Sequence, residues 1–320
     1  MNGQCPSCGE TGCDVLFSGP DFDSGTVRFA VCRCRTCGLV RTGPRPSDEE
    51  LGRYYSVPYY GAGQAKFSGP AEAITRFFNN LRAKEIRSRL GQGPGEGRRV
   101  LDIGCGRGRL LAALRDMGYE CHGVERNEFP AGDTTRDITL HIGDLKDCAF
   151  ENGSFDAVII WHALEHFGDP VETVRESARI LRKGGLLAIA VPNFGSMQSS
   201  LFRRNWFHLD LPRHLYHFTP QTLTGILKHF GFAVVSSTTF SAEQNIFGFV
   251  QSALNAMAPR CPNRFYSLLK KTSGAASSAA FIGWAALAAC IFPFAAAEYL
   301  VSGIAGKGAS LILYSRKQDL

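Results

Sequence analysis

Residues 99–108 read Arg-Val-Leu-Asp-Ile-Gly-Cys-Gly-Arg-Gly, and this stretch decides the fold. An apolar strand ends in an acid, Asp102, and continues into a turn that has glycine at every second position. A second strand ends in another acid, Glu125. Open α/β sheets build nucleoside sites in this way, beyond the carboxyl ends of their strands. Glycine lets the backbone approach a ligand where a Cβ would collide, so the stretch predicts a nucleoside site on an α/β fold.

The spacing of these glycines indicates which nucleoside is bound. Dinucleotide sites read G-x-G-x-x-G and place a pyrophosphate on a helix N-terminus. This chain reads G-x-G-x-G soon after Asp102, and a carboxylate there repels phosphate but suits a cation. S-adenosylmethionine carries an ammonium and a sulfonium and no phosphate. The stretch resembles motif I of the class I S-adenosylmethionine-dependent methyltransferases.

The rest of the chain continues the pattern of that family. We expect strands over residues 154–162, 186–191, 232–235 and 310–317, and helices over 169–182 and 219–230, with Gly184 and Gly185 stopping the first helix. Residues 126–137 are too broken for a helix, so this crossover is expected to be short or irregular. The resemblance covers roughly residues 96–240 and the last strand, and it implies a Rossmann-like α/β sheet of seven strands.

The same resemblance implies a cofactor site of seven residues, which are Asp102, Gly104, Cys105, Gly106, Glu125, Asp144 and Leu145. The glycine turn and Asp102 would hold the methionine end of S-adenosylmethionine. Glu125 would bind the ribose hydroxyls, and Asp144 with the Leu145 backbone would meet the adenine edge. The alternative for Asp144 is an ordinary acid in a turn.

Composition limits the class of protein. The chain has 320 residues, of which 20% are charged and 44% are hydrophobic, as is usual for globular proteins. Its net charge of +6 permits contact with anionic lipid or phosphate but does not establish it. The polar N-terminus is unlike a secretory signal, so we expect a cytoplasmic protein. In that compartment its 11 cysteines favour metal binding or free thiols over disulfides.

The first 45 residues carry two Cys-x-x-Cys-Gly turns. Their four thiols belong to Cys5, Cys8, Cys34 and Cys37. Two such turns complete a tetrahedral site for structural Zn²⁺, and the metal would supply folding energy that so small a segment lacks. We therefore predict a zinc ribbon with a strand over residues 26–31, in which Cys13 and Cys32 are spare. Unliganded thiols and a redox pair are the alternatives.

The segment after the ribbon resembles bacterial methyltransferases with a zinc-bearing N-terminus. Its tyrosines include Tyr59 and Tyr60, which we expect to contact substrate as part of a lid; packing of the ribbon onto the core is the alternative. The basic residues of the ribbon form only a thin face, so no nucleic acid partner is expected.

Two groups of histidines are candidates for a general base, a role that suits the ordinary pKa of histidine. The first group, His162, Glu165 and His166, follows the predicted strand over residues 154–162. Ubiquinone-pathway O-methyltransferases have a Glu-x-x-Glu-His run here that can help to hold a metal, but His162 replaces the first Glu. Capping of the next helix by Glu165 and His166 is the alternative.

The second group lies in residues 206–218, a loop where this fold usually builds its acceptor site. Arg213 could clamp a carboxylate or phosphate of the substrate, and His214 or His217 could be the base. The alternative is that these histidines lock the loop onto the fold.

Residues 279–297 contain no charge, and their number is close to the ~20 needed to cross a bilayer. Basic residues flank both ends, and residues 310–317 are expected to form a strand of the main sheet, so both ends should stay on the cytoplasmic side. We expect Pro293 and Gly303 to break the segment into a hairpin that dips into a membrane or packs on a partner. An alanine-rich helix buried against the enzyme is the alternative.

These observations predict five consecutive parts. They are a zinc ribbon (1–45), a lid and linker helix (46–95), a methyltransferase core (96–240), an apolar helical insertion (241–308) and a final core strand (309–320). The predicted reaction is methyl transfer from S-adenosylmethionine to a hydroxyl of a sugar, glycolipid or small metabolite. Methylation of carbon or nitrogen is one alternative, and a non-catalytic zinc-bearing scaffold at a membrane is another.

Overall fold

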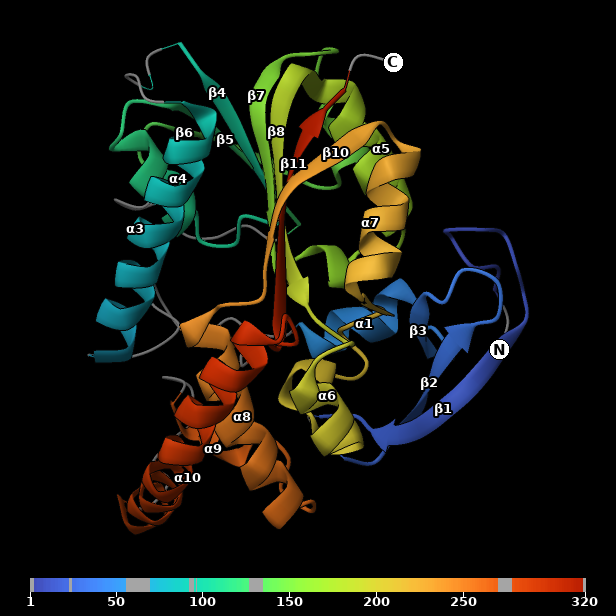
Figure 1. Ribbon diagram of the computed structural model, residues 1–320, viewed down its shortest axis with the longest axis vertical. Helices are drawn as coiled ribbons and strands as arrows, with labels where there is room; N and C mark the ends of the chain where they lie inside the picture. The colour runs from blue at the N-terminus through green and yellow to red at the C-terminus, as the bar shows by residue number, and fades with distance from the viewer. Residues whose placement is uncertain are drawn as a thin grey trace. The chain divides into compact units, whose positions relative to one another are not determined.

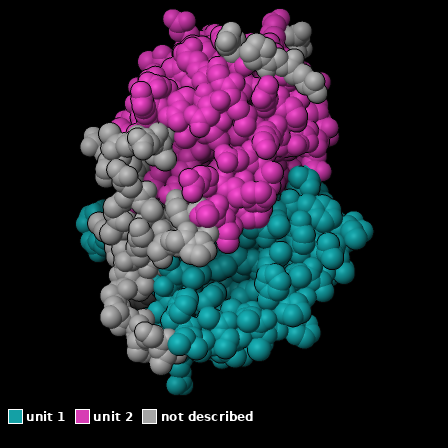
Figure 2. Space-filling model, turned by 90° about the vertical axis from the view of Figure 1, so that its left-hand side faces the viewer, with its two compact units in different colours: residues 1–68, 192–222, 238–311 teal, residues 69–191, 223–237, 312–320 magenta. Residues whose placement is uncertain are grey.

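The computed structural model describes residues 3–22, 25–55, 70–91, 95, 97–126, 135–269 and 278–318. The chain forms two compact units (Figure 2). Unit 1 comprises residues 1–68, 192–222 and 238–311, and unit 2 comprises residues 69–191, 223–237 and 312–320. The five consecutive parts predicted above stay a prediction, since these units divide the chain differently and place residues 192–222 with the N-terminal segment.

The main sheet has seven strands in the order β10-β11-β8-β7-β4-β5-β6 (Figure 1). They are β4 (Arg99–Ile103), β5 (Glu120–Glu125), β6 (Ile138–Ile142), β7 (Phe155–Trp161), β8 (Leu181–Pro192), β10 (Phe232–Thr238) and β11 (Ser310–Lys317). β4 pairs in parallel with both β5 and β7, so the chain reverses its direction across the sheet at β4. Such a switch point is where open α/β sheets bind ligands, at the carboxyl ends of the strands. This arrangement confirms the predicted Rossmann-like sheet.

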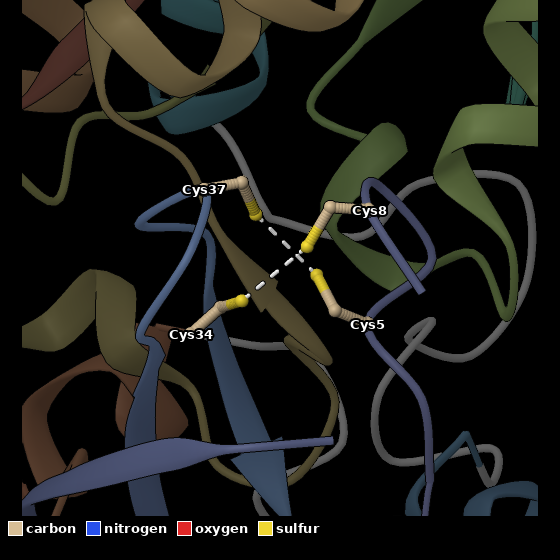
Figure 3. A group of neighbouring side chains, drawn as sticks. All are labelled: Cys5, Cys8, Cys34 and Cys37. Carbon is tan, nitrogen blue, oxygen red and sulfur yellow. Dashed lines mark hydrogen bonds between the residues drawn. The ribbon is translucent and has the colours of Figure 1, made fainter. Parts of the chain in front are cut away.

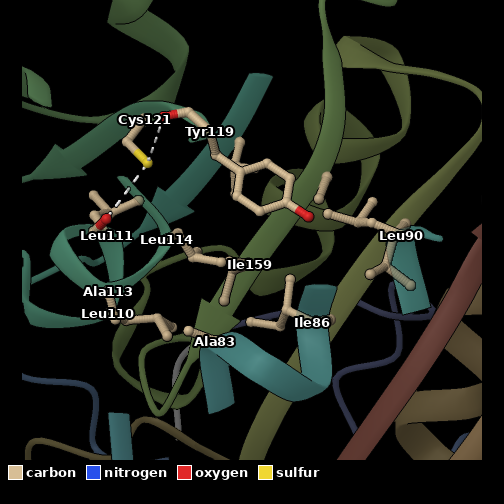
Figure 4. Close-up of a cluster of buried hydrophobic side chains, with 14 of the residues drawn as sticks. Ala83, Ile86, Leu90, Leu110, Leu111, Ala113, Leu114, Tyr119, Cys121 and Ile159 are labelled. Carbon is tan, nitrogen blue, oxygen red and sulfur yellow. Dashed lines mark hydrogen bonds between the residues drawn. The ribbon is translucent and has the colours of Figure 1, made fainter. Parts of the chain in front are cut away.

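Helices flank this sheet on both sides in Figure 1. α3 (Pro70–Leu90) and α4 (Arg109–Arg115) lie on one side, and α5 (Pro170–Ile180) and α7 (Pro220–His229) lie on the other. Figure 4 shows Ile86 of α3, Leu111 of α4 and Ile159 of β7 in one apolar cluster, each fully buried. A buried strand such as β7, Phe-Asp-Ala-Val-Ile-Ile-Trp, needs this cover because both of its faces are apolar.

The sequence placed the boundary between α5 and β8 wrongly. The helix ends at Ile180 and β8 begins at Leu181, so Gly184 and Gly185 lie inside the strand. Along the β7–β8 pair, Phe155 faces Leu181 but Ala157 faces Leu186, so β8 carries extra residues in a bulge. Gly184 has φ +68°, which favours glycine. The two glycines therefore form a bulge and do not stop a helix.

A second sheet of four strands has the order β1-β2-β3-β9 and lies within unit 1. Its strands are β1 (Cys13–Pro20), β2 (Arg28–Cys34), β3 (Val40–Gly43) and β9 (Tyr216–His217). Val31, Val40 and Trp206 are fully buried in one cluster beneath it. The helix α1 (Asp48–Tyr54) follows β3 and begins with a capping box formed by Ser47 and Glu50.

The helical part of unit 1 contains α6 (Met197–Phe202), α8 (Ala242–Met257), α9 (Arg264–Leu269) and α10 (Ser278–Ile304). The predicted hairpin within residues 279–303 is wrong, because α10 is one continuous helix with Pro293 inside it and Gly303 in its last turn. By length and composition, residues 280–304 of α10 could cross a membrane. Short 3₁₀ helices complete the fold: η1 (Leu145–Cys148), η2 (Leu164–His166), η3 (Arg203–Asn205) and η4 (Phe207–Leu209).

Candidate active site

The glycine turn after β4 is held against β5 by backbone hydrogen bonds. The amides of Gly104 and Cys105 donate to the Val124 carbonyl at 2.8 and 3.2 Å. Gly104 and Gly106 have φ of +76° and +52°, a region that favours glycine. A Cβ on Gly104 would lie 2.5 Å from the Ala163 Cβ, so no other residue fits there without movement. The turn brings together the predicted cofactor residues Gly104, Cys105 and Gly106.

Asp102 lies at the carboxyl end of β4 and is buried. Its Oδ1 has no hydrogen-bond partner among the described residues. Burial, together with repulsion from Glu125, raises its pKa from 3.8 to about 8, and Arg82 acts in the opposite direction. A buried carboxyl with a free oxygen is costly, and such groups mark sites that receive a ligand. A cation is the ligand that would offset this cost.

Glu125 closes β5 and contacts the glycine turn. Its Oε2 accepts a hydrogen bond from the Gly106 amide at 2.9 Å, and its Oε1 accepts one from the Arg126 amide at 2.9 Å. The two acids predicted to bind opposite ends of the same ligand therefore lie on neighbouring parallel strands. Their roles toward a ligand stay a prediction.

Arg82 of α3 is a site residue that the sequence analysis missed. Its guanidinium lies 5.1 Å from the centroid of the Trp161 ring, and it opposes the rise in the Asp102 pKa. Trp161 ends β7, and its Nε1 has no hydrogen-bond partner within the described parts of the chain. No motif or spacing in the sequence marks Arg82, because it lies in a helix well before the glycine turn and only packing brings it to Trp161.

Asp144 follows β6, and its side chain is partly exposed. The Arg126 Nε donates to its Oδ1 at 2.7 Å, and Leu145 begins η1 directly afterwards. The prediction that both residues meet the adenine edge stays open. Most of the crossover before β6, expected to be irregular, lies outside the described residues at 127–134.

The first histidine group lies at the carboxyl end of β7 and belongs to unit 2. His162 has φ +51°, and its Nδ1 lies 3.6 Å from Oε1 of the buried Glu165. His166 ends η2. The alternative role in capping the next helix is wrong, because Asp169 caps α5 by accepting from the Val171 and Glu172 amides. Strained backbone beside a buried acid is typical of functional sites.

The second group belongs to unit 1 and is tied to its own loop. The Arg213 guanidinium donates to both carboxylate oxygens of Asp210, at 2.9 and 2.5 Å. His214 is buried, and its Nδ1 donates to the His208 carbonyl at 2.8 Å. The Tyr55 hydroxyl donates to the Arg213 carbonyl at 3.4 Å. These contacts favour a structural role for much of the loop.

His217 lies on β9 in the four-stranded sheet and is buried. Its Nε2 is 3.0 Å from the Thr42 hydroxyl, which itself donates to the His214 carbonyl. Burial lowers the pKa of His217 to about 3. A ring with so low a pKa is a weak base at neutral pH, so this geometry favours packing over catalysis for His217. Tyr59 and Tyr60, the other predicted substrate contacts, lie outside the described residues.

Four thiols converge at the N-terminal end of unit 1 (Figure 3). They are those of Cys5, Cys8, Cys34 and Cys37, whose sulfurs all lie within 4.8 Å of one another. Sulfurs are 3.5 Å apart in the Cys5–Cys37 pair and in the Cys8–Cys34 pair. Tetrahedral Zn²⁺ with bonds of ~2.3 Å would place its sulfurs ~3.8 Å apart. The donor set and spacing therefore fit a structural zinc ion, and Cys13 and Cys32 lie outside the group.

The chain is similar to known methyltransferases in sequence. A family model described as a methyltransferase domain matches residues 75–237. The chain is 35% identical over 119 residues to a ubiquinone biosynthesis O-methyltransferase of Caulobacter sp. (strain K31), covering 35% of this chain and 47% of that protein. It is 30% identical over 133 residues to the protein of the same description from Xanthomonas oryzae pv. oryzae (strain PXO99A), covering 39% and 54%. The chain thus spans about half the length of these curated relatives.

Among solved structures, the [4+2]-cyclase SpnF is similar with a TM-score of 0.51 and 17% identity. The match covers 86% of this chain and 97% of that structure. At this identity the likeness concerns the fold alone, because one fold supports different reactions.

Proposed function

Because the chain belongs to the class I S-adenosylmethionine-dependent methyltransferases, we propose that it transfers the methyl group of this cofactor to an oxygen of its acceptor. The observation that carries the proposal is Asp102, a buried acid next to the glycine turn whose Oδ1 has no hydrogen-bond partner in the described parts of the chain. Bound S-adenosylmethionine supplies an electrophilic methyl group on a sulfonium. The methionine ammonium would satisfy Asp102, and the Glu125 carboxylate would accept from the ribose hydroxyls.

The chain's own contribution is mainly to position the two reactants. Holding donor and acceptor in line can contribute roughly 7–11 kcal/mol in favourable cases. A hydroxyl acceptor also needs a base, and we assign this role to the His162 and His166 group. Glu165, 3.6 Å from His162, would hold that ring and favour its protonated form after proton transfer. His214 is the alternative candidate for the general base.

The proposed acceptor is a hydroxyl of a sugar, a glycolipid or a small metabolite. The two relatives support oxygen, since both are described as O-methyltransferases of ubiquinone biosynthesis. Methylation of carbon or nitrogen remains the alternative. We further propose that the enzyme works in the cytoplasm at the inner face of a membrane, which the long uncharged stretch of α10 supports.

Calorimetric titration with S-adenosylmethionine and S-adenosylhomocysteine tests the cofactor assignment. We expect dissociation constants in the micromolar range, about −8 kcal/mol, for the wild-type chain. Asp102→Ala should abolish binding, whereas the exposed Asp116→Ala should leave it unchanged. No binding of either ligand by the wild type would favour a non-catalytic scaffold.

We also propose that the four thiols bind one structural Zn²⁺. Metal analysis of the purified chain should find about one ion per molecule. The double variant Cys5→Ser with Cys37→Ser should lose it, because two of four ligands are gone. The matched control is Cys13→Ser with Cys32→Ser, which should keep the metal. Zinc at the wild-type level in the first variant would refute this ligand set.

A further inference from the structure

We propose that α10 docks side-on onto an anionic lipid bilayer, with the face that points away from α8 among the acyl chains. This inference rests on the membrane contact proposed above and does not depend on the methyl-transfer reaction. It names the helix, its orientation and the lipid class.

The apolar surface of α10 is exposed to an unusual extent. Residues 278–297 carry no charge, and only 6% of the helix's apolar 18-residue window is buried. Ile282, Phe294 and Ile304 are 64%, 70% and 81% exposed. A helix that is apolar on all sides belongs in a protein core or in a membrane. Since the described part of the chain does not enclose α10 in a core, we infer that its apolar environment lies outside the chain.

Among the described residues, α10 packs on the protein along one stripe. Trp284, Ala288 and Ile291 join the cluster formed by Val250 of α8 and Phe265 of α9. At about 100° per residue, the exposed apolar positions then cover more than half of the helix circumference. A second copy of the chain would bury one self-complementary face and leave the remainder in water. Lipid chains adapt to the whole exposed surface, which favours a bilayer as the occupant.

The far end of α8 shows why the contact is side-on. The Phe207 amide donates to Ser252 Oγ at 2.8 Å, and Asn255 Nδ2 donates to the Asn205 carbonyl at 3.3 Å. α8 is therefore packed against η3 and η4, and it cannot enter a bilayer lengthwise as half of a free hairpin. α10 lies along α8, so its ~40 Å length would lie in the plane of the interface.

The polar contacts of α10 point to the protein side. Glu298 accepts a hydrogen bond from Gln198 Nε2 at 2.7 Å, and the same nitrogen contacts the Asn245 carbonyl at 2.8 Å. Ser302, one turn further on, is fully buried. The one carboxylate of α10 is thus held away from the proposed lipid face.

Charge selects the type of lipid. The acids of this helical part, Glu243 and Glu298, lie where α8 begins and where α10 ends. The exposed Arg260 and Arg264 follow the far end of α8, and the exposed Arg203 and Arg204 precede Asn205 at the same end. Four described arginines therefore lie at this end of the helical part, whereas the exposed Lys307 follows the other end of α10. Clustered arginines beside an apolar surface bind anionic headgroups.

Flotation of the full-length chain with vesicles tests the inference. We expect the chain to bind vesicles of equal parts phosphatidylglycerol and phosphatidylcholine. Its binding to vesicles of pure phosphatidylcholine should be at least about tenfold weaker. Ile282→Glu with Phe294→Glu should lower binding to the anionic vesicles by about tenfold or more. Both positions are exposed, so the fold should survive. The matched control is Val15→Glu, at a position on β1 that is 59% exposed.

Three results would overturn the inference. In the first, the wild-type chain stays in the soluble fraction. In the second, the Ile282→Glu, Phe294→Glu variant floats with the vesicles like the wild type. In the third, the wild-type chain is a dimer without lipid and this double variant is a monomer, which would assign the apolar face to a second copy of the chain. Arg260→Gln with Arg264→Gln is a second variant, which adds no charge to the apolar face. It should weaken binding to the anionic vesicles and leave binding to pure phosphatidylcholine unchanged. Titration with S-adenosylmethionine on the same samples separates the two proposals, because loss of cofactor binding with intact flotation refutes only the reaction.

Discussion

Replacing Asp102 by asparagine should stabilise the folded protein while it removes cofactor binding. The substitution keeps the size of the side chain and removes its charge. In the folded chain the pKa of Asp102 is about 8, against 3.8 for an ordinary aspartate, because the carboxyl is buried beside Glu125. Between pH 3.8 and 8 the folded state therefore holds a proton that the unfolded state has lost. Stability must fall as pH rises through this window.

The size of the effect follows from the same two pKa values. At pH 7 the unfolded aspartate is about 3.2 pH units above its pKa, and each unit is worth about 1.36 kcal/mol. Ionisation of Asp102 in the unfolded state thus favours unfolding by about 4 kcal/mol at pH 7. Asp102→Asn removes this contribution, so the variant should gain up to about that amount, and the gain should shrink toward pH 4.

Urea titrations of wild type and variant at pH 5, 6, 7 and 8 measure this difference. The difference in unfolding free energy should grow by about 1.4 kcal/mol per pH unit up to pH 7 and by less between pH 7 and 8, where the folded carboxyl also ionises. Asp116→Asn, at an exposed site, should follow the wild type within about 0.5 kcal/mol. Cofactor affinity of the wild type should rise toward pH 8, since an ammonium binds the ionised carboxylate. A variant no more stable than the wild type at pH 7, or an equal gain at every pH, would refute the reasoning.

Further predictions concern the turn, the histidines and the core. Gly104→Ala should cost more than about 1 kcal/mol of stability and abolish cofactor binding, because its Cβ would meet Ala163 at 2.5 Å with φ at +76°; unchanged calorimetric affinity would contradict this. His217→Gln should flatten the loss of stability below pH 6.5, because burial lowers the folded pKa to about 3 and the unfolded ring binds a proton first; an acid titration parallel to that of the wild type would contradict it. His166→Ala should lower turnover far more than cofactor affinity, and wild-type turnover would remove His166 as the base. Ile159→Ala should cost about 2–5 kcal/mol, measured by urea denaturation, since Ile159 is fully buried in β7.

Much of the fold could be predicted from local pattern alone. β7 is apolar along most of its length, and Asp169 with Pro170 marks the start of α5 clearly. These signals depend on neighbours in the sequence, so they do not need the tertiary structure. The glycines at residues 184–185 predicted the wrong boundary, because a helix stop and a strand bulge use the same residue type. Only the pairing of β8 with β7 decides between them.

Part of the candidate site could also be predicted, because some of its residues are neighbours in the sequence. Asp102 and the glycine turn are adjacent in sequence, so their pattern could be recognised. Arg82 comes from a helix well before the turn, and only packing brings it to Trp161. The contacts of His217 with Thr42 likewise join residues that are 175 positions apart, and no spacing rule links them. Chemistry that depends on such long-range contacts is invisible in a single sequence.

The pairing of β3 with β9 limits how the N-terminal segment of this chain can change in evolution or be replaced by design. Val40 faces His217 and Arg41 faces Tyr216, so the fourth strand of the four-stranded sheet comes from a segment far along the chain. Excision of the N-terminal residues would leave β9 as an unpaired edge and expose Trp206 and Leu211, which would invite aggregation. We therefore expect that the N-terminal segment cannot be exchanged as a self-contained unit. Any lineage or design that gains, loses or replaces it must rewrite residues 206–218 at the same time.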